Sequence, residues 1–278
     1  MKETFFREYT SQHAILKYSK ATAGSGISYL LEHDYKNVYL SAFGLLPAEV
    51  RAQPLRVLEF GCGAGMNLMH LTFLLSQEGL RVDRAIGTDF SPVLIDTARR
   101  EAKRYVQNGE LNKIEFHVAK TESLLTDLMT ELKCNQSDLE GSFQFILGVN
   151  TIRYCHAANK EMDGVRELFR LLAPGGICVI IDMNNRFPLF RSELKNRFRW
   201  KKRLECYIPS LEEYTAPFSK IGFHIIRQGH FCWIPHSAGG FGLGIMKALS
   251  PLLNVVAHSR AMRSLVIAAK PVTILTRS

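Results

Sequence analysis

The sequence predicts an α/β fold built on a Rossmann-like, mostly parallel sheet of seven strands with helices on both faces. Two observations predict it. Five short apolar segments between Leu55 and Asp182 alternate with helix-forming segments, an order that gives a parallel sheet covered on both sides. Three glycines at alternate positions, Gly61, Gly63 and Gly65, follow the first apolar segment and indicate a tight turn from strand to helix.

Each element is expected from its apolar pattern and its end signals. The expected strands are 56–60, 84–88, 114–119, 143–149, 177–181, 224–233 and 265–269. The expected helices are about 65–77, 92–107, one after residue 123, one containing 165–172, and 211–221. Pro92 suits the first turn of its helix, and Ser91 suits the cap. Parallel strands joined by right-handed crossovers place their carboxyl ends along one edge, where ligands bind.

The glycine turn carries an acid, Glu59, two positions before the first glycine. A dinucleotide-binding turn has its third glycine three positions after the second, where this chain has Met66. The spacing instead resembles motif I of the class I S-adenosylmethionine (SAM) dependent methyltransferases, small-molecule type related to the quinone-biosynthesis enzymes. The resemblance covers residues 55–182 and includes the Leu-Leu-Ala-Pro-Gly-Gly stretch at 171–176. It implies SAM as cofactor and methyl transfer as the reaction.

The resemblance also implies where the cofactor lies. Asp89 ends the second strand, where the family binds the ribose hydroxyls. Lys120 stands where the family has an acid for the adenine amino group, and Lys120 cannot accept a hydrogen bond, so Thr121, Glu122, backbone carbonyls or packing would replace that contact. The expected cofactor-binding residues are Glu59, Phe60, Gly61, Cys62, Gly63, Gly65, Asn67, Asp89, Phe90, Ser91, Thr121, Glu122, Asn150 and Tyr18.

The loop after the fourth strand supplies the candidate catalytic residues. His156 is the preferred general base, because its pKa lies near operating pH; a surface loop histidine is the alternative. Tyr154 and Arg153 are candidates for orienting the acceptor, and Arg153 could pair with a carboxylate or phosphate. Asn150 stands where metal-dependent relatives need an aspartate, so we expect no metal.

Residues 1–50 are expected to form an N-terminal helical lid, and residues 51–278 the SAM-binding domain. Insertions at about 184–209 and 235–263 leave the ligand edge and are expected to cap the acceptor. Residues 186–203 hold eight basic side chains and one acid. A helix there would lie on an anionic membrane surface, grip an acidic substrate, or simply cover the site. The helix expected within 239–256 would add an apolar wall.

The compartment expected is the cytoplasm. The first eight residues include acids and no long apolar run, unlike a secretory signal, and no segment reads as a spanning helix. The six cysteines form no C-x-x-C pair, which fits reduced thiols. The net charge of +9 is concentrated in one segment, so it does not indicate a nucleic-acid partner.

The expected function is SAM-dependent methylation of a small or medium-sized hydrophobic metabolite, at oxygen, with His156 as base. Three alternatives stay open: a C- or N-methyltransferase acting on a lipid-like or anionic acceptor, an RNA methyltransferase, and a nonenzymatic SAM-binding protein. The fourth strand is followed by Asn150-Thr151-Ile152-Arg153 and not by the Asn-Pro-Pro-Tyr motif of nucleobase-amine methyltransferases, which argues against that acceptor class.

Overall fold

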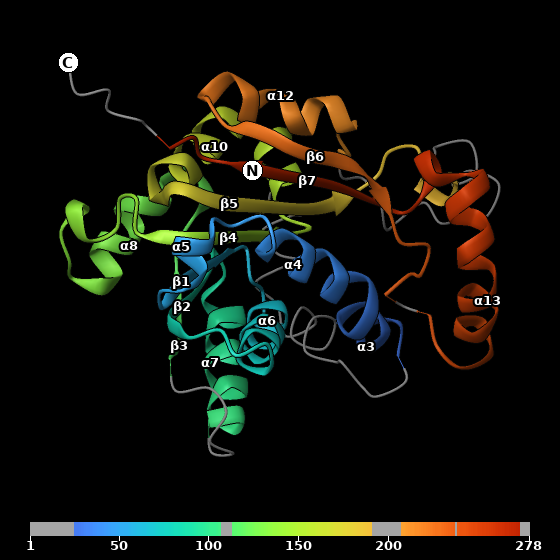
Figure 1. The fold of residues 1–278 in the computed structure, drawn as a ribbon, viewed down its shortest axis with the longest axis horizontal. Helices are drawn as coiled ribbons and strands as arrows, with labels where there is room; N and C mark the ends of the chain where they lie inside the picture. Colours follow the sequence, from blue (N-terminus) through green and yellow to red (C-terminus); the bar gives the residue numbers. More distant parts are fainter. Residues whose placement is uncertain (1–24, 107–112, 191–206, 237, 273–278) are drawn as a thin grey trace.

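A computed structural model describes residues 25–106, 113–190, 207–236 and 238–272. Its centre is a seven-stranded sheet in the order β3-β2-β1-β4-β5-β7-β6 (Figure 1). Strands β1 to β5 are parallel, and β7 runs antiparallel to both β5 and β6. The strands are Leu55–Phe60 (β1), Val82–Asp89 (β2), Ile114–Val118 (β3), Phe143–Val149 (β4), Leu172–Met183 (β5), His224–Phe231 (β6) and Arg263–Ala269 (β7). The predicted fold class is confirmed.

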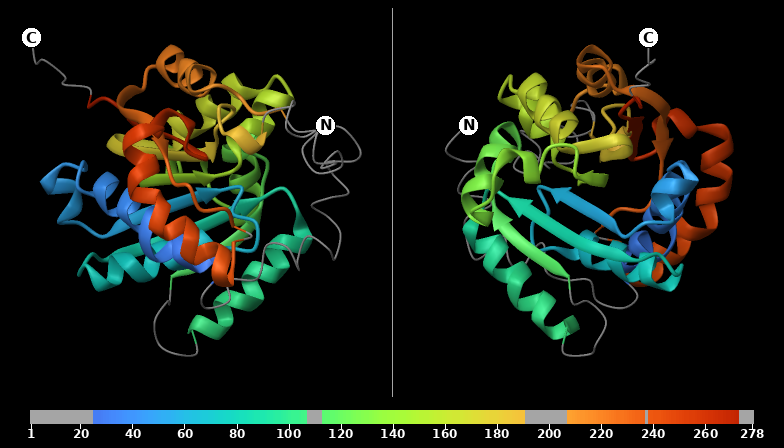
Figure 2. Two further views of the ribbon diagram at one scale, coloured as in Figure 1. Left: turned by 90° about the vertical axis from the view of Figure 1, so that its right-hand side faces the viewer. Right: turned by 60° about the vertical axis from the view of Figure 1, so that its left-hand side comes forward.

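Helices cover both faces of the sheet (Figure 2). On one face α6 (Met66–Gln77) and α7 (Pro92–Val106) share a core with the N-terminal helices. On the other face α8 (Leu124–Leu132), α9 (Ile152–Ala157), α10 (Glu161–Leu171) and α12 (Leu211–Ile221) share a second core. Neighbouring residues of β1 point to opposite cores, Val57 to the first and Leu58 to the second, as the two-residue period of a strand requires.

One strand begins earlier than the sequence predicts. The Pro174-Gly175-Gly176 turn was expected to precede β5, but pairing with β4 already starts at Leu172, with an irregular register between Phe143 and Phe145. Gly175 takes a left-handed φ of 76°, and its amide donates to the Lys270 carbonyl at 2.8 Å. Glycine tolerates this conformation without steric cost, so the strand continues through the turn.

The N-terminal segment forms a nearly continuous helix against the first core. It comprises α3 (Gly26–Tyr29), a π-helical turn η1 (Leu30–Tyr35) and α4 (Lys36–Phe43), followed by the single turn α5 (Ala48–Arg51). Phe43 stacks on Phe145 of β4 with ring centroids 4.1 Å apart. The segment is therefore fixed to the centre of the sheet. Tyr18 and the rest of residues 1–24 lie outside the described part.

Both insertions leave the carboxyl edge of the parallel strands, as expected. In the first, Phe187 is buried and packs on Trp233, with the 3-10 turn η4 (Pro188–Phe190) after it; the predicted basic helix falls mostly on residues 191–206, outside the described part. The second contains α13 (Gly240–Val256) and the turn η5 (His258–Arg260). Among the described helices, none combines the length and apolar character needed to cross a bilayer.

Candidate active site

The site lies where the strand order reverses, between β1 and β4. Chain order runs outward from β1 through β2 to β3, and then β4 pairs with the opposite side of β1. This switch point opens a crevice at the carboxyl ends of two neighbouring strands. Thr151, two residues after β4, links the ends of the two strands, because its hydroxyl can donate to the Gly61 carbonyl at 3.3 Å and to the Val149 carbonyl at 3.1 Å.

The three glycines of the turn after β1 have different reasons to be glycine. All three have left-handed φ angles of 61°, 55° and 83°, which side chains disfavour. A Cβ on Gly61 would overlap the side chain of Thr151, and one on Gly65 would overlap the ring of Phe116. A Cβ on Gly63 would meet nothing within 4 Å. Gly63 is therefore the member of the turn that borders open space.

Glu59 is a fully buried carboxyl without a conventional hydrogen bond. Its exposed fraction is 0%, and neither carboxylate oxygen has a partner among the described residues. Burial raises the pKa of Glu59 to about 8, although the Asn67 side chain and the Leu68 amide lie close enough to oppose this in part. A buried group with two unused acceptors is suited to a ligand that brings donors or positive charge.

Asp89, at the end of β2, is bound to the glycine turn. Its two oxygens accept from the amides of Gly63 at 3.0 Å and Ser91 at 2.9 Å. Burial raises its pKa to about 6, against the lowering effect of these two bonds. Each oxygen keeps a further lone pair, so Asp89 can hold the turn and still accept from ligand hydroxyls.

A buried ion pair anchors α9 to the end of β5. The guanidinium of Arg153 donates to Asp182 at 2.7 Å, and the Arg153 amide donates to the same carboxylate at 3.2 Å. Arg153 also donates to the Tyr154 hydroxyl at 2.6 Å and lies over the Tyr154 ring. The two residues expected to orient the acceptor are thus joined to each other and to the sheet.

A second buried arginine, Arg263, reaches the same edge and was missed by the sequence analysis. It donates to the Asn150 side-chain oxygen, and to the His236 ring nitrogen Nε2 at 2.9 Å. Since Nε2 accepts, His236 is neutral, and burial together with Arg263 and Arg153 lowers its pKa well below the ordinary value. Tyr35 of η1 also contacts this nitrogen, at 3.3 Å. These bonds join the N-terminal helix to the site.

His156, the candidate base, lies at the end of α9 and packs edge-to-face on Tyr214 of α12, with ring centroids 5.7 Å apart. Its Nε2 atom is buried and has no hydrogen-bond partner among the described residues. Burial lowers the pKa of His156, while Glu161, Glu213 and Asp182 oppose this. The ring is therefore neutral at physiological pH, with a nitrogen available to accept a proton.

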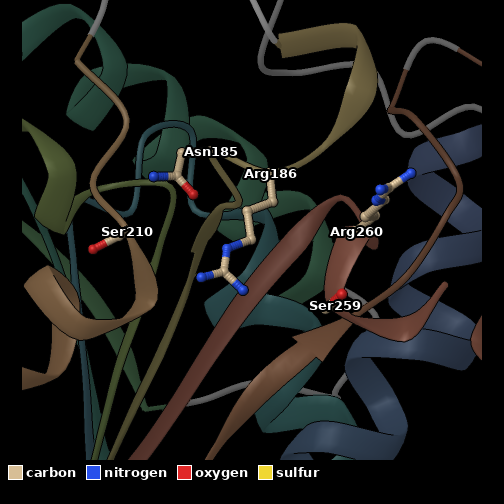
Figure 3. A pocket seen from close by; sticks show the side chains of 5 residues that line it. All are labelled: Asn185, Arg186, Ser210, Ser259 and Arg260. Atoms are coloured by element: carbon tan, nitrogen blue, oxygen red, sulfur yellow. The ribbon is translucent and has the colours of Figure 1, made fainter.

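A polar cavity of about 490 Å³ lies between the two insertions. Its lining residues are neutral polar or basic: Asn185, Arg186, Ser210, Ser259 and Arg260 (Figure 3). The loop that carries Arg186 is held in place by Asn184, whose side-chain amide donates to the carbonyls of Ser259 and Ala261 at 3.0 and 2.7 Å. This cavity suits an anionic group.

Comparison with known proteins identifies the family of this chain. Residues 31–235 match the family model of the methyltransferase domain. This chain belongs to that family. It is a SAM-dependent methyltransferase, and the quinone-biosynthesis subtype stays a prediction.

Individual relatives are distant. Over 136 residues the methyltransferase is 29% identical to the citrinin polyketide synthase of Monascus ruber, a match that covers 49% of this chain and only 4% of that protein. Its fold resembles magnesium protoporphyrin IX methyltransferase from Synechocystis, solved with bound SAH (TM-score 0.58, 13% identity, covering 97% and 100% of the two chains). It also resembles the CurJ carbon methyltransferase (TM-score 0.56, 17% identity, 93% and 57%).

The residues of the methyltransferase fit its cofactor. Glu59 offers buried acceptors without partners, and the space over Gly63 is open. SAM supplies a methyl group on a positively charged sulfur, and its methionine end carries an ammonium. Glu59 and the turn amides would hold the methionine end, and Asp89 the ribose.

The remaining expected cofactor residues of the methyltransferase near the turn are placed less directly. The Phe60 side chain is in the second core against Gly148, so only its backbone reaches the edge. Cys62 is buried, and its amide donates to the Thr88 carbonyl at 2.8 Å. Asn67 accepts a hydrogen bond from Tyr39 of α4 at 3.3 Å. Asn67 therefore links the N-terminal helix to the start of α6, just after the glycine turn.

The residues beyond β2 and β3 complete the set. Phe90 is half-buried beside Asp89. Ser91 caps α7, because its hydroxyl accepts from the Leu94 amide at 3.4 Å. Glu122 pairs with Lys160 at 3.2 Å, while Thr121 is half-buried. The end of β3 lies beside Asp89, since the Ala119 amide donates to the Asp89 carbonyl at 3.0 Å. All lie near the same edge, and their cofactor contacts stay predictions.

Proposed function

We propose that this methyltransferase methylates an oxygen atom of a hydrophobic small or medium-sized metabolite, with His156 as general base. The observation that carries the proposal is the buried, unpartnered Nε2 of a neutral histidine on the helix that follows β4. Buried polar atoms normally have partners, and one without is suited to a partner that arrives with the substrate.

The chemistry needs one proton acceptor. SAM would supply the methyl group, and Nε2 of His156 would accept the proton that the acceptor hydroxyl loses as its oxygen takes the methyl group. Burial keeps the ring unprotonated, which leaves Nε2 ready for that proton. Tyr214 restrains the ring by its edge-to-face contact. Positioning of the two reactants supplies much of the remaining acceleration.

The test uses isotopically labelled SAM and an apolar metabolite extract, followed by kinetics on the acceptor found. His156→Ala should lower kcat by roughly 10²- to 10⁴-fold and leave the affinity for SAH unchanged. His224→Ala, a change at an exposed histidine on β6, is the matched control and should keep full activity.

The pH profile and the product complete the test. Wild-type activity should fall on the acid side as His156 becomes protonated, and that limb should vanish in His156→Ala. Unchanged turnover in His156→Ala would remove it as the base. A product whose new methyl group is bonded to carbon or nitrogen, read by NMR, would overturn oxygen as the acceptor atom.

A further inference from the structure

Helix α13 differs from the other described surface helices because its outer face is apolar. One side of it faces the protein: Leu243 is buried, and Met246 and Leu253 are partly buried against the first core. The opposite side, at helical spacing, consists of large apolar side chains that are exposed. These are Phe241 (85%), Ile245 (43%), Leu249 (44%), Leu252 (60%), Val255 (81%) and Val256 (68%).

A helix at a protein surface normally turns a polar stripe to water. The one charged residue of α13, Lys247, lies to the side, with its ammonium 4.3 Å from the centroid of the Tyr29 ring. In the left view of Figure 2, α13 lies in front of the sheet, along the surface of the molecule. Contiguous exposed apolar surface of this kind marks a site of interaction.

The charge of the chain indicates what covers this face. Residues 184–278 contain 15 lysines and arginines against four acids, whereas the net charge of the whole chain is only +9. The sequence has no acidic residue after Glu213. Immediately beyond α13, Arg260 lines the polar cavity together with Arg186. Among the described residues, Arg186 and Arg260 therefore bring positive charge to the cavity that follows α13, and positive charge complements an anionic surface.

Helix α13 lies beyond the carboxyl edge of the parallel strands. The arrowhead of β5 points toward α13 in Figure 1, and η5 connects α13 to the start of β7, where Arg263 contacts Asn150. A surface that covered α13 would thus lie near the carboxyl edge of the sheet, where the acceptor enters.

We propose that α13 docks this protein on an anionic lipid bilayer. The helix lies in the plane of the surface, with its apolar face among the acyl chains and with Arg186 and Arg260 at lipid phosphates. Its 17 residues span about 25 Å, which suits a helix that lies on a bilayer and does not cross it. A second copy of the chain fits less well, because it would bring two positively charged surfaces together.

The experiment is co-sedimentation of the whole protein with phosphatidylcholine vesicles, with and without phosphatidylglycerol. Wild-type protein should bind the anionic vesicles more tightly than the neutral ones, and added salt should weaken the binding. Leu252→Asp should weaken it at least about tenfold, because an apolar anchor is replaced by a repelled charge. Val272→Asp is the control, because it introduces the same negative charge at an apolar residue outside α13 that is also 60% exposed.

The charged groups are tested separately. Arg186→Ala and Arg260→Ala should each reduce binding to anionic vesicles about fivefold and leave the weaker binding to neutral vesicles unchanged. Equal losses on both kinds of vesicle would contradict the assignment of these arginines to lipid phosphates.

Three results would overturn the proposal: no sedimentation of wild type with anionic vesicles, equal binding by Leu252→Asp, or a wild-type dimer that Leu252→Asp converts to monomer. SAH affinity, measured by calorimetry on each variant, separates this proposal from methyl transfer. Vesicle binding without SAH binding would contradict the proposed function alone. SAH binding without vesicle binding would contradict only the docking proposal.

Discussion

At the scale of the residue, the site contains two carboxyl groups whose pKa values are raised by burial. Glu59 lies near the end of β1 and Asp89 ends the neighbouring β2, and their pKa values are raised to about 8 and about 6. An acid that keeps its proton in the folded state and loses it when unfolded makes the folded state less stable as pH rises between the two pKa values. Both groups therefore stabilise the ligand-free fold more at low pH than at neutral pH, and a positively charged ligand group beside Glu59 would favour its ionised form.

In the ligand-free protein, the raised pKa of Glu59 should change how the free energy of unfolding depends on pH. Between the ordinary pKa of 4.5 and the raised value of about 8, Glu59 should lower the free energy of unfolding by roughly 4 kcal/mol. Glu59→Gln should remove this loss, so that its Tm falls less than that of wild type from about pH 5 to about pH 8. If the Tm of the two proteins changed equally over this pH range, burial would not raise the pKa of Glu59.

The sequence revealed some site residues and concealed others for physical reasons. Glu59 and Gly63 were found because turn geometry restricts which residues can follow a strand. Arg263 was not, because β7 is antiparallel, so that its first residue, and not the residue after its end, reaches the ligand edge. His236 lies in a loop without a local pattern. Only their bonds to Asn150 and Tyr35, far away in sequence, identify them.

At the scale of the element, the position of helix α9 depends on Asp182. This carboxylate is fully buried and accepts from the Arg153 side chain and from the amides of Arg153 and Met183. Removing one partner of a buried pair leaves the other charge without compensation. The position of α9, and with it that of His156, is therefore set by the end of β5.

The second prediction tests this anchor by urea denaturation. Asp182→Asn should lower the free energy of unfolding by about 3–5 kcal/mol. Asp163→Asn breaks an ion pair with Arg166 of 2.9 Å in which both side chains are more than half exposed, and it should cost less than about 1 kcal/mol. Similar losses of unfolding free energy in the two variants would mean that burial of the Arg153–Asp182 pair adds nothing to its contribution to stability.

Elements were easier to predict than their environments. Helix α12 has the predicted bounds because Ser210 and Glu213 form a capping box and Gly222 ends it in a left-handed conformation. Helix α13 lies within the expected range of 239–256, but its apolar spacing suggested a wall of the site. Periodicity identifies an apolar helix face without indicating what covers it, and the structure leaves most of this one exposed.

At the scale of the whole molecule, the site results from topology. The reversal of strand order between β1 and β4 brings the glycine turn beside Thr151, and the antiparallel β7 brings Arg263 to the same edge. Alternating apolar segments predicted the parallel part of this arrangement. The pairing of the last two strands depends on long-range contacts that no local pattern encodes.

We propose that the open space over Gly63 holds the cofactor, and calorimetry with SAH tests this most directly. Gly63→Ala and Gly79→Ala form a matched pair, because both glycines have left-handed φ angles and neither Cβ would meet an atom within 4 Å. Each change should cost about 1–2 kcal/mol of stability. Only Gly63→Ala should weaken SAH binding, by at least about tenfold, or roughly 1.4 kcal/mol. Equal SAH affinity in the two variants would place the cofactor elsewhere and contradict the account.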